Sequence, residues 1–186
     1  MKLLYFDVET TGLSAAKCAI HQLSFIIEID GSIKERINLQ IRPFTGALVS
    51  DTALKISNVT EEQISKYPYD YWQAFKVFEK VLDRYIDKYK KSDKFFLVGY
   101  NNATFDNHFL RAFHLRNEHK YFGSYFWANP IDVYVLASHK VMNERHLLTD
   151  FKLKTACKHF NIEVDESKLH DAIYDVELTR DLFKKL

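Results

Sequence analysis

The chain has 186 residues, of which 47% are hydrophobic and 15% aromatic, and its formal net charge is +1. A nearly neutral chain lacks the overall basic charge of a protein that holds duplex DNA mainly through phosphates, so any contact with nucleic acid must be local. Its two cysteines, Cys18 and Cys157, predict neither a zinc motif nor a disulfide framework, and no apolar run is long enough to span a membrane, so we expect a soluble, cytoplasmic protein.

The first predicted element is a strand over residues 3–9, followed at once by the turn sequence Thr-Thr-Gly-Leu. The strand is apolar on both faces, which is typical of a buried central strand. Asp7 and Glu9 project from one face because side chains alternate along a strand, with Cα atoms about 6.6 Å apart. Two like charges about 4 Å apart repel by roughly 4 kcal/mol at a dielectric near 20. An isolated Asp-x-Glu usually lies on a solvated edge, but the end of a central strand favours a metal site.

The next elements predict a mixed sheet. Residues 22–29 and 33–41 have the composition and alternation of two strands, and Asp30-Gly31 between them is typical of a hairpin turn. Because a hairpin joins antiparallel strands, and later strands in the chain are separated by helices, we expect parallel and antiparallel pairs in the same sheet.

Two helices are predicted after these strands. Thr60 and Gln63 form a capping-box pattern for a short one, and a long amphipathic one follows. Its apolar positions recur at steps of three and four at Tyr71, Phe75, Phe78, Leu82, Tyr85 and Tyr89. This face is expected to lie against the sheet.

A strand-to-helix junction places another carboxylate. Residues 95–100 form a short apolar strand, and helical spacing begins at Phe105, so Asp106 lies at the junction. The remaining helices are predicted over residues 131–140, over residues 153–160 and from residue 171 to the end. This order of strands and helices predicts one compact α/β domain over residues 1–186.

The last chemistry-bearing pair is His170 and Asp175. Five residues within a helix rotate by about 500°, so the two side chains would diverge by roughly 140° if both were helical. We therefore expect His170 in the loop that enters the last helix and Asp175 in its first turns. Taken alone, a histidine five residues from an aspartate is more often a surface pair.

Three motifs follow one another along the chain: Asp7-Val8-Glu9-Thr10-Thr11-Gly12-Leu13, Asn102-Ala103-Thr104-Phe105-Asp106-Asn107-His108-Phe109-Leu110 and His170-x-Ala172-x-x-Asp175. Together they resemble the motifs of the DEDDh 3′-to-5′ exonucleases, which include proofreading subunits of DNA polymerases and ribonuclease T. The resemblance extends over about residues 3–183. It implies a ribonuclease H-like fold, an α/β fold with a central mixed five-stranded sheet flanked by helices.

The resemblance also implies a set of ligands and roles. Asp7, Glu9, Asp106 and Asp175 would hold two Mg²⁺ or Mn²⁺ ions, which prefer hard oxygen ligands. Asp7 would bridge both ions, Glu9 and Asp175 would complete the site of the water-activating ion, and Asp106 would hold the second ion through water. His170 would act as general base, for which an ordinary histidine pKa near 6.5 is suitable.

Substrate contacts are also implied by the resemblance, at the backbone of Thr10 and the side chains of Leu13 and Phe105. For Leu13 and Phe105, packing in the core is an equally good interpretation. A locally basic stretch could follow a phosphate backbone or simply be a solvated surface. It comprises Lys140, Arg145, His146, Lys152, Lys154 and Lys158.

Two departures from the family pattern lie close to these contacts. Asn101-Asn102 stands where family members often carry His-Asn, and Ile56-Ser57-Asn58-Val59 stands where they often carry Ile-His-Gly-Ile. Neither removes a predicted catalytic group, but both affect the surroundings of the terminal nucleotide and hence the choice between DNA and RNA.

The expected function is that of a metal-dependent 3′-to-5′ exonuclease that releases nucleoside monophosphates from single-stranded or frayed DNA, alone or with a DNA polymerase in a replication or repair complex. RNA ends are the alternative substrate, because no residue is identified that would recognise a 2′-hydroxyl. A nucleic-acid-binding module that has lost its chemistry is a third hypothesis, which the presence of all four carboxylates and His170 disfavours.

Overall fold

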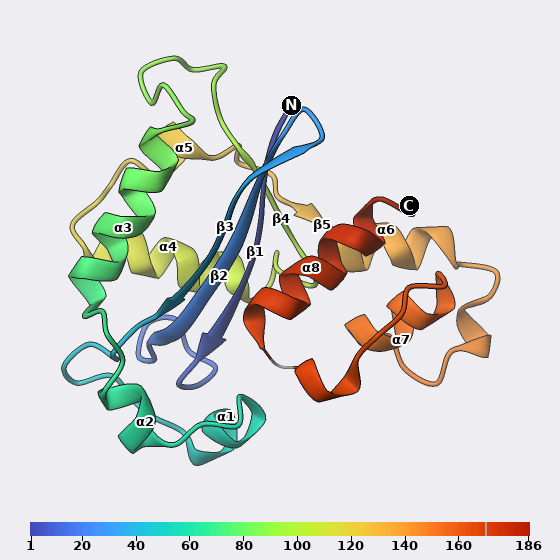
Figure 1. The fold of residues 1–186 in the computed structure, drawn as a ribbon, viewed down its shortest axis with the longest axis horizontal. Helices are drawn as coiled ribbons and strands as arrows, with labels where there is room; N and C mark the ends of the chain where they lie inside the picture. The colour runs from blue at the N-terminus through green and yellow to red at the C-terminus, as the bar shows by residue number, and fades with distance from the viewer. Residues whose placement is uncertain (170) are drawn as a thin grey trace.

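The computed structural model describes residues 1–169 and 171–186, which form a twisted sheet with helices on both faces (Figure 1). Within these residues the strand order is β3-β2-β1-β4-β5, so β1 is central. The strands are β1 Lys2–Thr10, β2 Ile20–Ile29, β3 Ser32–Gln40, β4 Phe96–Gly99 and β5 Ile131–Asp132. The helices are α1 Asp51–Ile56, α2 Glu61–Ser65, α3 Tyr71–Asp83, α4 Asp106–Arg116, α5 Phe122–Tyr125, α6 Val133–Lys140, α7 Leu153–His159 and α8 Ala172–Phe183, with short 3-10 helices η1 Arg145–Leu147 and η2 Glu166–Lys168.

The sheet is mixed, as predicted. β1 pairs antiparallel with β2, with Asp7 opposite Ser24 and Glu9 opposite Gln22. On its other side β1 pairs parallel with β4, with Tyr5 opposite Val98. The carboxyl ends of β1 and β4 therefore lie at the same edge of the sheet, where a strand-end site can form.

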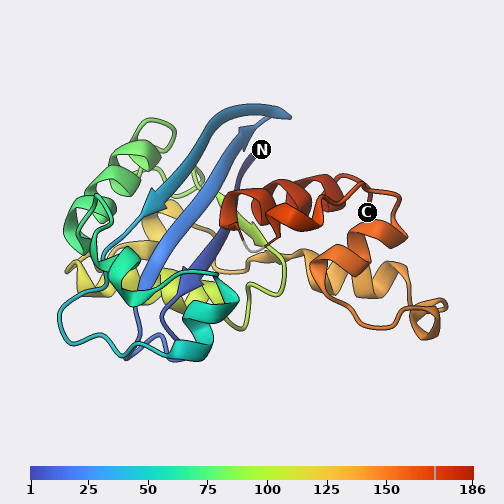
Figure 2. The same cartoon turned by 60° about the horizontal axis from the view of Figure 1, so that its bottom comes forward.

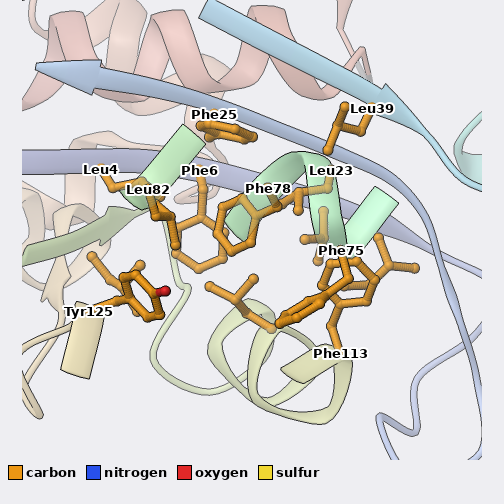
Figure 3. Packing of buried hydrophobic residues seen from close by; sticks show 14 of the residues in the cluster. Leu4, Phe6, Leu23, Phe25, Leu39, Phe75, Phe78, Leu82, Phe113 and Tyr125 are labelled. Carbon is orange, nitrogen blue, oxygen red and sulfur yellow. The ribbon is translucent and has the colours of Figure 1, made fainter. Parts of the chain in front are cut away.

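One face of β1 packs against α3 and α4. Leu4, Phe6 and Val8 are buried in this core, and Figure 3 shows the phenylalanine rings that fill it. The ring centroids of Phe25 on β2 and Phe78 on α3 are 5.1 Å apart in an edge-to-face arrangement. Such aromatic pairs add about 0.5–1.5 kcal/mol beyond area burial, so the aromatic-rich composition is used largely for packing.

The opposite face of β1 packs against α6, α7 and α8, which lie on the other side of the sheet from α3 (Figure 2). Leu3 and Tyr5 are buried in this second core. Asp7 and Glu9 continue the same alternate row of side chains, so they emerge on the α8 side at the end of the strand. The sheet thus directs both carboxylates to one face, as the alternation predicted.

Two predicted helices have different limits. α3 ends at Asp83 rather than reaching Tyr89, because the Lys2 ammonium binds the Tyr85 carbonyl and the Asp87 N–H donates to Asp93 Oδ2 at 3.0 Å, which draws the chain into a turn. The predicted helix over residues 131–140 begins at Val133 instead.

Residues 131 and 132 form strand β5, because Asp132 serves as the cap of α6. Its Oδ1 accepts hydrogen bonds from Tyr134 N at 3.0 Å and Asn101 N at 2.9 Å, and its Oδ2 accepts from Ala103 N at 3.2 Å. One carboxylate therefore starts a helix and orders the segment after β4 at the same time. Helices α1 and α5, which have four to six residues each, were not predicted.

No helix in the described residues combines the length and the apolar character needed to cross a membrane.

Gly99 ends β4 directly before the turn that leads to Asp106, and its lack of a side chain is required there. A Cβ atom at this position would lie 2.6 Å from the Cβ of Asn102, which is fully buried. We expect Gly99→Ala to destabilise the fold by about 1–3 kcal/mol through overpacking, or roughly 2–10 °C in Tm for a chain of this size. Thermal unfolding followed by circular dichroism measures this. Gly123→Ala is the matched control, since an added Cβ there meets nothing within 4 Å; equal Tm values for Gly99→Ala and the wild type would contradict the prediction.

Candidate active site

Four predicted carboxylates come from three elements that meet at the carboxyl edge of the sheet (Figure 1). Asp7 and Glu9 lie near the end of β1, Asp106 is the first residue of α4, and Asp175 lies in the first turn of α8. Their charges act on one another: Asp106, Glu9 and Asp175 all raise the pKa of Asp7. The structure thus brings together the four residues that the motifs indicated. His170 lies outside the described residues.

Asp106 is fastened to the end of β1. It is 6% exposed, and its Oδ1 accepts a hydrogen bond from the backbone N–H of Val8 at 3.2 Å. Val8 stands between Asp7 and Glu9, so this bond sets the Asp106 carboxylate beside both. The start of α4 is held by a further bond, from Asn107 N to Asn102 O at 3.0 Å.

Ser57 is a contact that the motifs did not indicate. It lies directly after α1, and its Oγ donates a hydrogen bond to Glu9 Oε2 at 2.5 Å. Burial raises the pKa of Glu9 to about 7, and the Ser57 hydrogen bond opposes this rise. Ser57 stands at a position where family members often carry a histidine. Its hydroxyl binds one oxygen of the Glu9 carboxylate but does not neutralise the negative charge of Glu9.

The site is electrostatically unfavourable as it stands. Burial, followed by repulsion from the neighbouring carboxylates, holds the pKa of Asp7 well above its usual range. Burial likewise raises the pKa of Asp106 to about 7, in spite of the Val8 hydrogen bond. In the part of the chain that the structure describes, no lysine or arginine forms an ion pair with Asp7, Glu9 or Asp106. Within the described residues, folding therefore gathers these three carboxylates without pairing any of them with a lysine or an arginine.

The chemistry of these donors fits a hard divalent cation. Carboxylate oxygens are the ligands that Mg²⁺ and Mn²⁺ prefer, and a bound cation would remove the repulsion that raises the pKa values. Among the described residues, no three His, Cys, Asp or Glu side chains already stand in the arrangement of a preformed metal site. The fit therefore rests on donor type and mutual electrostatics.

Gln22 ties the start of α8 to the sheet. Its Nε2 donates to Asp171 Oδ1 at 3.2 Å and to Asn38 Oδ1 at 3.0 Å. Asp171 in turn caps α8, since the same Oδ1 accepts from Ile173 N at 3.3 Å. Because Gln22 is also the partner of Glu9 across the ladder, the entry to α8 is anchored next to the carboxylates.

A cavity of about 270 Å³ opens beside Glu9, and we call it the β1 pocket. Its walls are mostly apolar and come from the turn after β1, from α1 and from the start of α4. The three residues predicted to contact substrate, Thr10, Leu13 and Phe105, all line it, together with Ser57. Leu13 is 88% exposed, so it is not a core residue, whereas Phe105 also packs against the α3/α4 core.

Hydrogen bonds fix the turn that forms one wall of the β1 pocket. Thr10 Oγ1 donates to Gly12 O at 2.9 Å, and Thr11 Oγ1 donates to Leu48 O at 2.7 Å while accepting from Ala19 N at 2.9 Å. The two threonines therefore brace the turn from inside. Leu13 extends from this fixed turn into solvent.

The basic stretch of residues 140–158 is partly neutralised. Lys154 and Lys158 both pair with Glu166, at 3.7 and 2.5 Å, and the Arg145 guanidinium lies 4.9 Å from the centre of the Phe151 ring. These contacts stabilise the packing of α7 on η2 and leave less free charge for a phosphate backbone than the sequence indicated.

Comparison with known proteins agrees with this geometry. The family model described as Exonuclease matches residues 4–183. The DNA polymerase III PolC-type protein of Pediococcus pentosaceus is 30% identical over 179 residues, which cover 96% of this chain and 11% of that protein. The ribonuclease T of Histophilus somni is 26% identical over 182 residues, which cover 95% of this chain and 79% of that protein. The chain thus spans only about a tenth of the length of the PolC-type relative.

Solved structures share the fold. The structure of E. coli exonuclease I in complex with a dT13 oligonucleotide has a TM-score of 0.76 at 20% identity, covering 98% of this chain and 40% of that one. A zinc-bound form of the E. coli exonuclease I complex with single-stranded DNA has a TM-score of 0.78 at 21% identity. The match covers 100% of this chain and 40% of that one. The mixed five-stranded sheet with flanking helices matches the ribonuclease H-like fold of these structures. The chain belongs to the exonuclease family, as its three motifs predicted.

Asp106→Asn tests the electrostatic cost of the site in metal-free protein. Because the folded-state pKa of about 7 exceeds the unfolded value near 3.9, the folded state binds this proton more tightly and loses stability as pH rises through 7. We expect the variant, in EDTA, to be more stable than the wild type at pH 8 by as much as about 4 kcal/mol, at about 1.36 kcal/mol per pKa unit, with the difference vanishing near pH 4. Urea unfolding at several pH values measures this. Asp165→Asn is a control with an effect of opposite sign, because hydrogen bonds lower the pKa of the exposed Asp165 carboxyl. If the stability difference between Asp106→Asn and the wild type did not change with pH, the explanation would be contradicted.

Ser57→Ala removes the hydroxyl that orients Glu9. Partners that orient metal ligands typically contribute 10–100-fold to metal affinity. We expect Mn²⁺ binding, measured by calorimetry, to weaken by about tenfold, and Ser57→Thr to restore most of it. The matched control is Ser50→Ala, another serine of the β1 pocket, which should bind Mn²⁺ as the wild type does. Unchanged affinity in Ser57→Ala would show that the Glu9 contact has no role in metal binding.

Proposed function

We propose that this protein is a metal-dependent 3′-to-5′ exonuclease that releases nucleoside monophosphates from single-stranded or frayed DNA. The observation that carries this proposal is the β1 pocket, which opens directly beside the carboxylates and is lined by Thr10, Leu13 and Phe105. Its volume of about 270 Å³ is slightly below the roughly 300–1,000 Å³ of drug-sized ligand sites, which favours a single unpaired nucleoside over a larger ligand. A strand whose last nucleoside fills this pocket presents its terminal phosphodiester to the carboxylates. The 3′-to-5′ direction rests on the resemblance of the motifs.

Asp7, Glu9, Asp106 and Asp175 are the proposed ligands of two Mg²⁺ or Mn²⁺ ions. Such a pair of ions, when bound, supplies an activated water and neutralises the charge that develops on the phosphate. Asp7 and Glu9 are delivered by one strand, and the Val8 hydrogen bond keeps Asp106 beside them. His170 is proposed to accept the proton of the attacking water, a role supported by the motif and by the anchoring of its neighbour Asp171 to Gln22.

The pocket residues have simple roles in this proposal. Leu13, from the turn after β1, and Phe105, at the start of α4, offer apolar surfaces to a base and its sugar, and the Thr10 hydrogen bond to Gly12 braces the turn next to Glu9. Apolar contact on the faces of a base does not depend on which base it is. An exonuclease that proceeds through any sequence requires a pocket of this kind.

DNA is the preferred substrate class in this proposal because PolC-type DNA polymerases are among the relatives and the exonuclease I structures contain DNA oligonucleotides. RNA is the second candidate, since the ribonuclease T relatives match along most of their own length. The PolC-type relatives also support a polymerase as partner. The proposed unit of function is one exonuclease domain over residues 1–186 acting inside the cell, consistent with two free, buried cysteines.

A timed digestion of matched 5′-labelled DNA and RNA single strands tests the proposal. We expect a ladder that shortens from the 3′ end with Mg²⁺ or Mn²⁺ and is abolished by EDTA. Asp7→Ala should lose all turnover, because it removes one of the four carboxylates proposed to hold the metal ions, and it also controls for contaminating nucleases. Faster loss of DNA than of RNA is the expected order. Shortening from the 5′ end, or equal turnover in Asp7→Ala, would refute the proposal, and faster loss of RNA would replace DNA by RNA as the substrate.

His170→Ala separates metal binding from proton transfer in the same assay. A positioned general base typically contributes 10²–10⁴ in rate. The variant should therefore bind Mn²⁺ like the wild type in calorimetry but cleave about 100-fold more slowly or worse. Wild-type turnover in this variant would remove His170 from the mechanism.

A further inference from the structure

We propose that the outer face of α4, together with the loop that follows β1, forms a binding track for the single strand upstream of its 3′-terminal nucleotide. The α4 track consists of Phe105, His108, Ala112 and Arg116 on the helix side and Leu13 and Lys17 on the loop side. The proposal rests on the proposed function, since it extends the same substrate beyond the β1 pocket.

The helix side of the track is a continuous row. Phe105, His108, Ala112 and Arg116 follow one another at steps of three and four, which aligns them along one line of a helix. Phe105 lines the β1 pocket, Ala112 is half-buried, and His108 and Arg116 are exposed. The row therefore leads away from the pocket along the surface. From residue 106 to residue 116 it is about 15 Å long at 1.5 Å per residue.

The loop side is joined to the far end of the helix. The Arg116 guanidinium binds the carbonyl of Ala16, three residues after Leu13, and its Cζ lies 3.8 Å from the centre of the Phe44 ring. The turn that forms the pocket wall and the end of α4 are therefore held side by side. An arginine has five N–H donors, so most of those on Arg116 are free for a phosphate in addition to the Ala16 carbonyl.

The charge of this surface matches a nucleic acid backbone. The chain contains 25 acidic residues, about one in seven, yet residues 10–27, 41–50 and 107–117 contain none. Residues 10–27 and 107–117 supply every residue of the track except Phe105, and residues 41–50 supply Phe44, which also lines a hollow together with Glu61 and Asp70. Neither Lys17 nor Arg116 pairs with a carboxylate among the described residues. Glu118, just beyond Arg116, lines a hollow with Phe44 and Trp72 and marks the end of the acid-free surface.

Single-stranded nucleic acids bind to surfaces that combine cations for phosphates with aromatic or planar groups for bases. The track offers Lys17 and Arg116 for phosphates, and at its two ends it offers the Phe105 ring and the planar Arg116 guanidinium, which lies over the Phe44 ring, for stacking. A length of about 15 Å accommodates four to five nucleotides at the roughly 3.4 Å spacing of a stacked strand. Catalytic efficiency should therefore rise with substrate length up to about six nucleotides and then level off.

The test measures kcat/KM for removal of the first nucleotide from DNA oligonucleotides of two, four, six and twelve residues. We expect the wild type to gain at least tenfold between the dinucleotide and the hexamer and little thereafter. The double variant Lys17→Gln/Arg116→Gln should lose most of this gain, so that its ratio of hexamer to dinucleotide kcat/KM falls far below that of the wild type. The salt dependence of hexamer binding should weaken by about 1.4 in log–log slope, at 0.7 per phosphate contact on a single strand.

Two further variants separate a specific role of Lys17 and Arg116 from a general effect of positive charge. Lys91→Gln is the matched control, an exposed lysine shortly before β4 and therefore at the opposite edge of the sheet from the carboxylates. Arg116→Lys retains the charge but not the planar group over Phe44, and should keep an intermediate share of the length effect. A wild type without length dependence, or a double variant that retains it in full, would overturn the track. Equal losses on the dinucleotide and the hexamer would also overturn it, since they would place the defect in the pocket.

Binding without turnover separates this proposal from the proposed function. The affinity of 5′-labelled hexamer and dinucleotide is measured by fluorescence anisotropy in Ca²⁺ and in EDTA. Hexamer binding that is at least tenfold tighter than dinucleotide binding and is lost in the double variant supports the track even if no cleavage is found. Equal binding of the two lengths overturns it even if the exonuclease activity is present.

Discussion

The repulsion among carboxylates at the end of β1 is the constraint on which the rest of the structure depends. Asp7, Glu9 and Asp106 have raised pKa values because folding buries them near one another, and no lysine or arginine of the described part of the chain pairs with them. At a protein-surface dielectric, each close pair costs on the order of a few kcal/mol, a large share of the 5–15 kcal/mol by which a domain is normally stable. The surrounding fold must hold these groups in place against that cost.

The sheet does this by placing the carboxylates on its most constrained strand. β1 is paired on both sides, and its two faces are sealed by separate cores, one with α3 and α4 and one with α6, α7 and α8. Hydrogen bonds then fix the remaining groups to this strand: Val8 holds Asp106, Ser57 holds Glu9, and Gln22 holds the entry to α8. The first bond joins β1 to the start of α4, the second joins β1 to the residue after α1, and the third joins β2 to the residue that caps α8. The packing energy of the two cores therefore holds the carboxylates together in spite of their mutual repulsion.

The sequence predicted those parts of this arrangement that depend on local pattern. Alternation along residues 3–9 was sufficient to place Asp7 and Glu9 on one face, and strand-helix spacing placed Asp106 at its junction. Contacts between distant residues could not be predicted this way: Ser57 and Glu9 are 48 positions apart, and nothing near Ser57 in the sequence indicates its partner. β5 has only two residues, too few to show a strand period, and its end is set by the three hydrogen bonds that Asp132 accepts from other segments.

Ser57, which stands where family members often carry a histidine, shows how a long-range contact can differ while the four predicted carboxylates are all present. A histidine at this position could carry a positive charge next to Glu9, whereas the serine hydroxyl supplies a hydrogen bond and no charge. The repulsion between Glu9 and the other carboxylates is therefore left for a bound cation to relieve, and the smaller side chain leaves room in the β1 pocket. The wall of the β1 pocket includes Leu13, from which the proposed α4 track leads away, and residues 10–27 and 107–117, which supply most of that track, contain no acidic residue. In the proposed function, separation of the carboxylates from the α4 track allows one nearly neutral chain to attract a polyanion and still bind metal ions at an anionic centre.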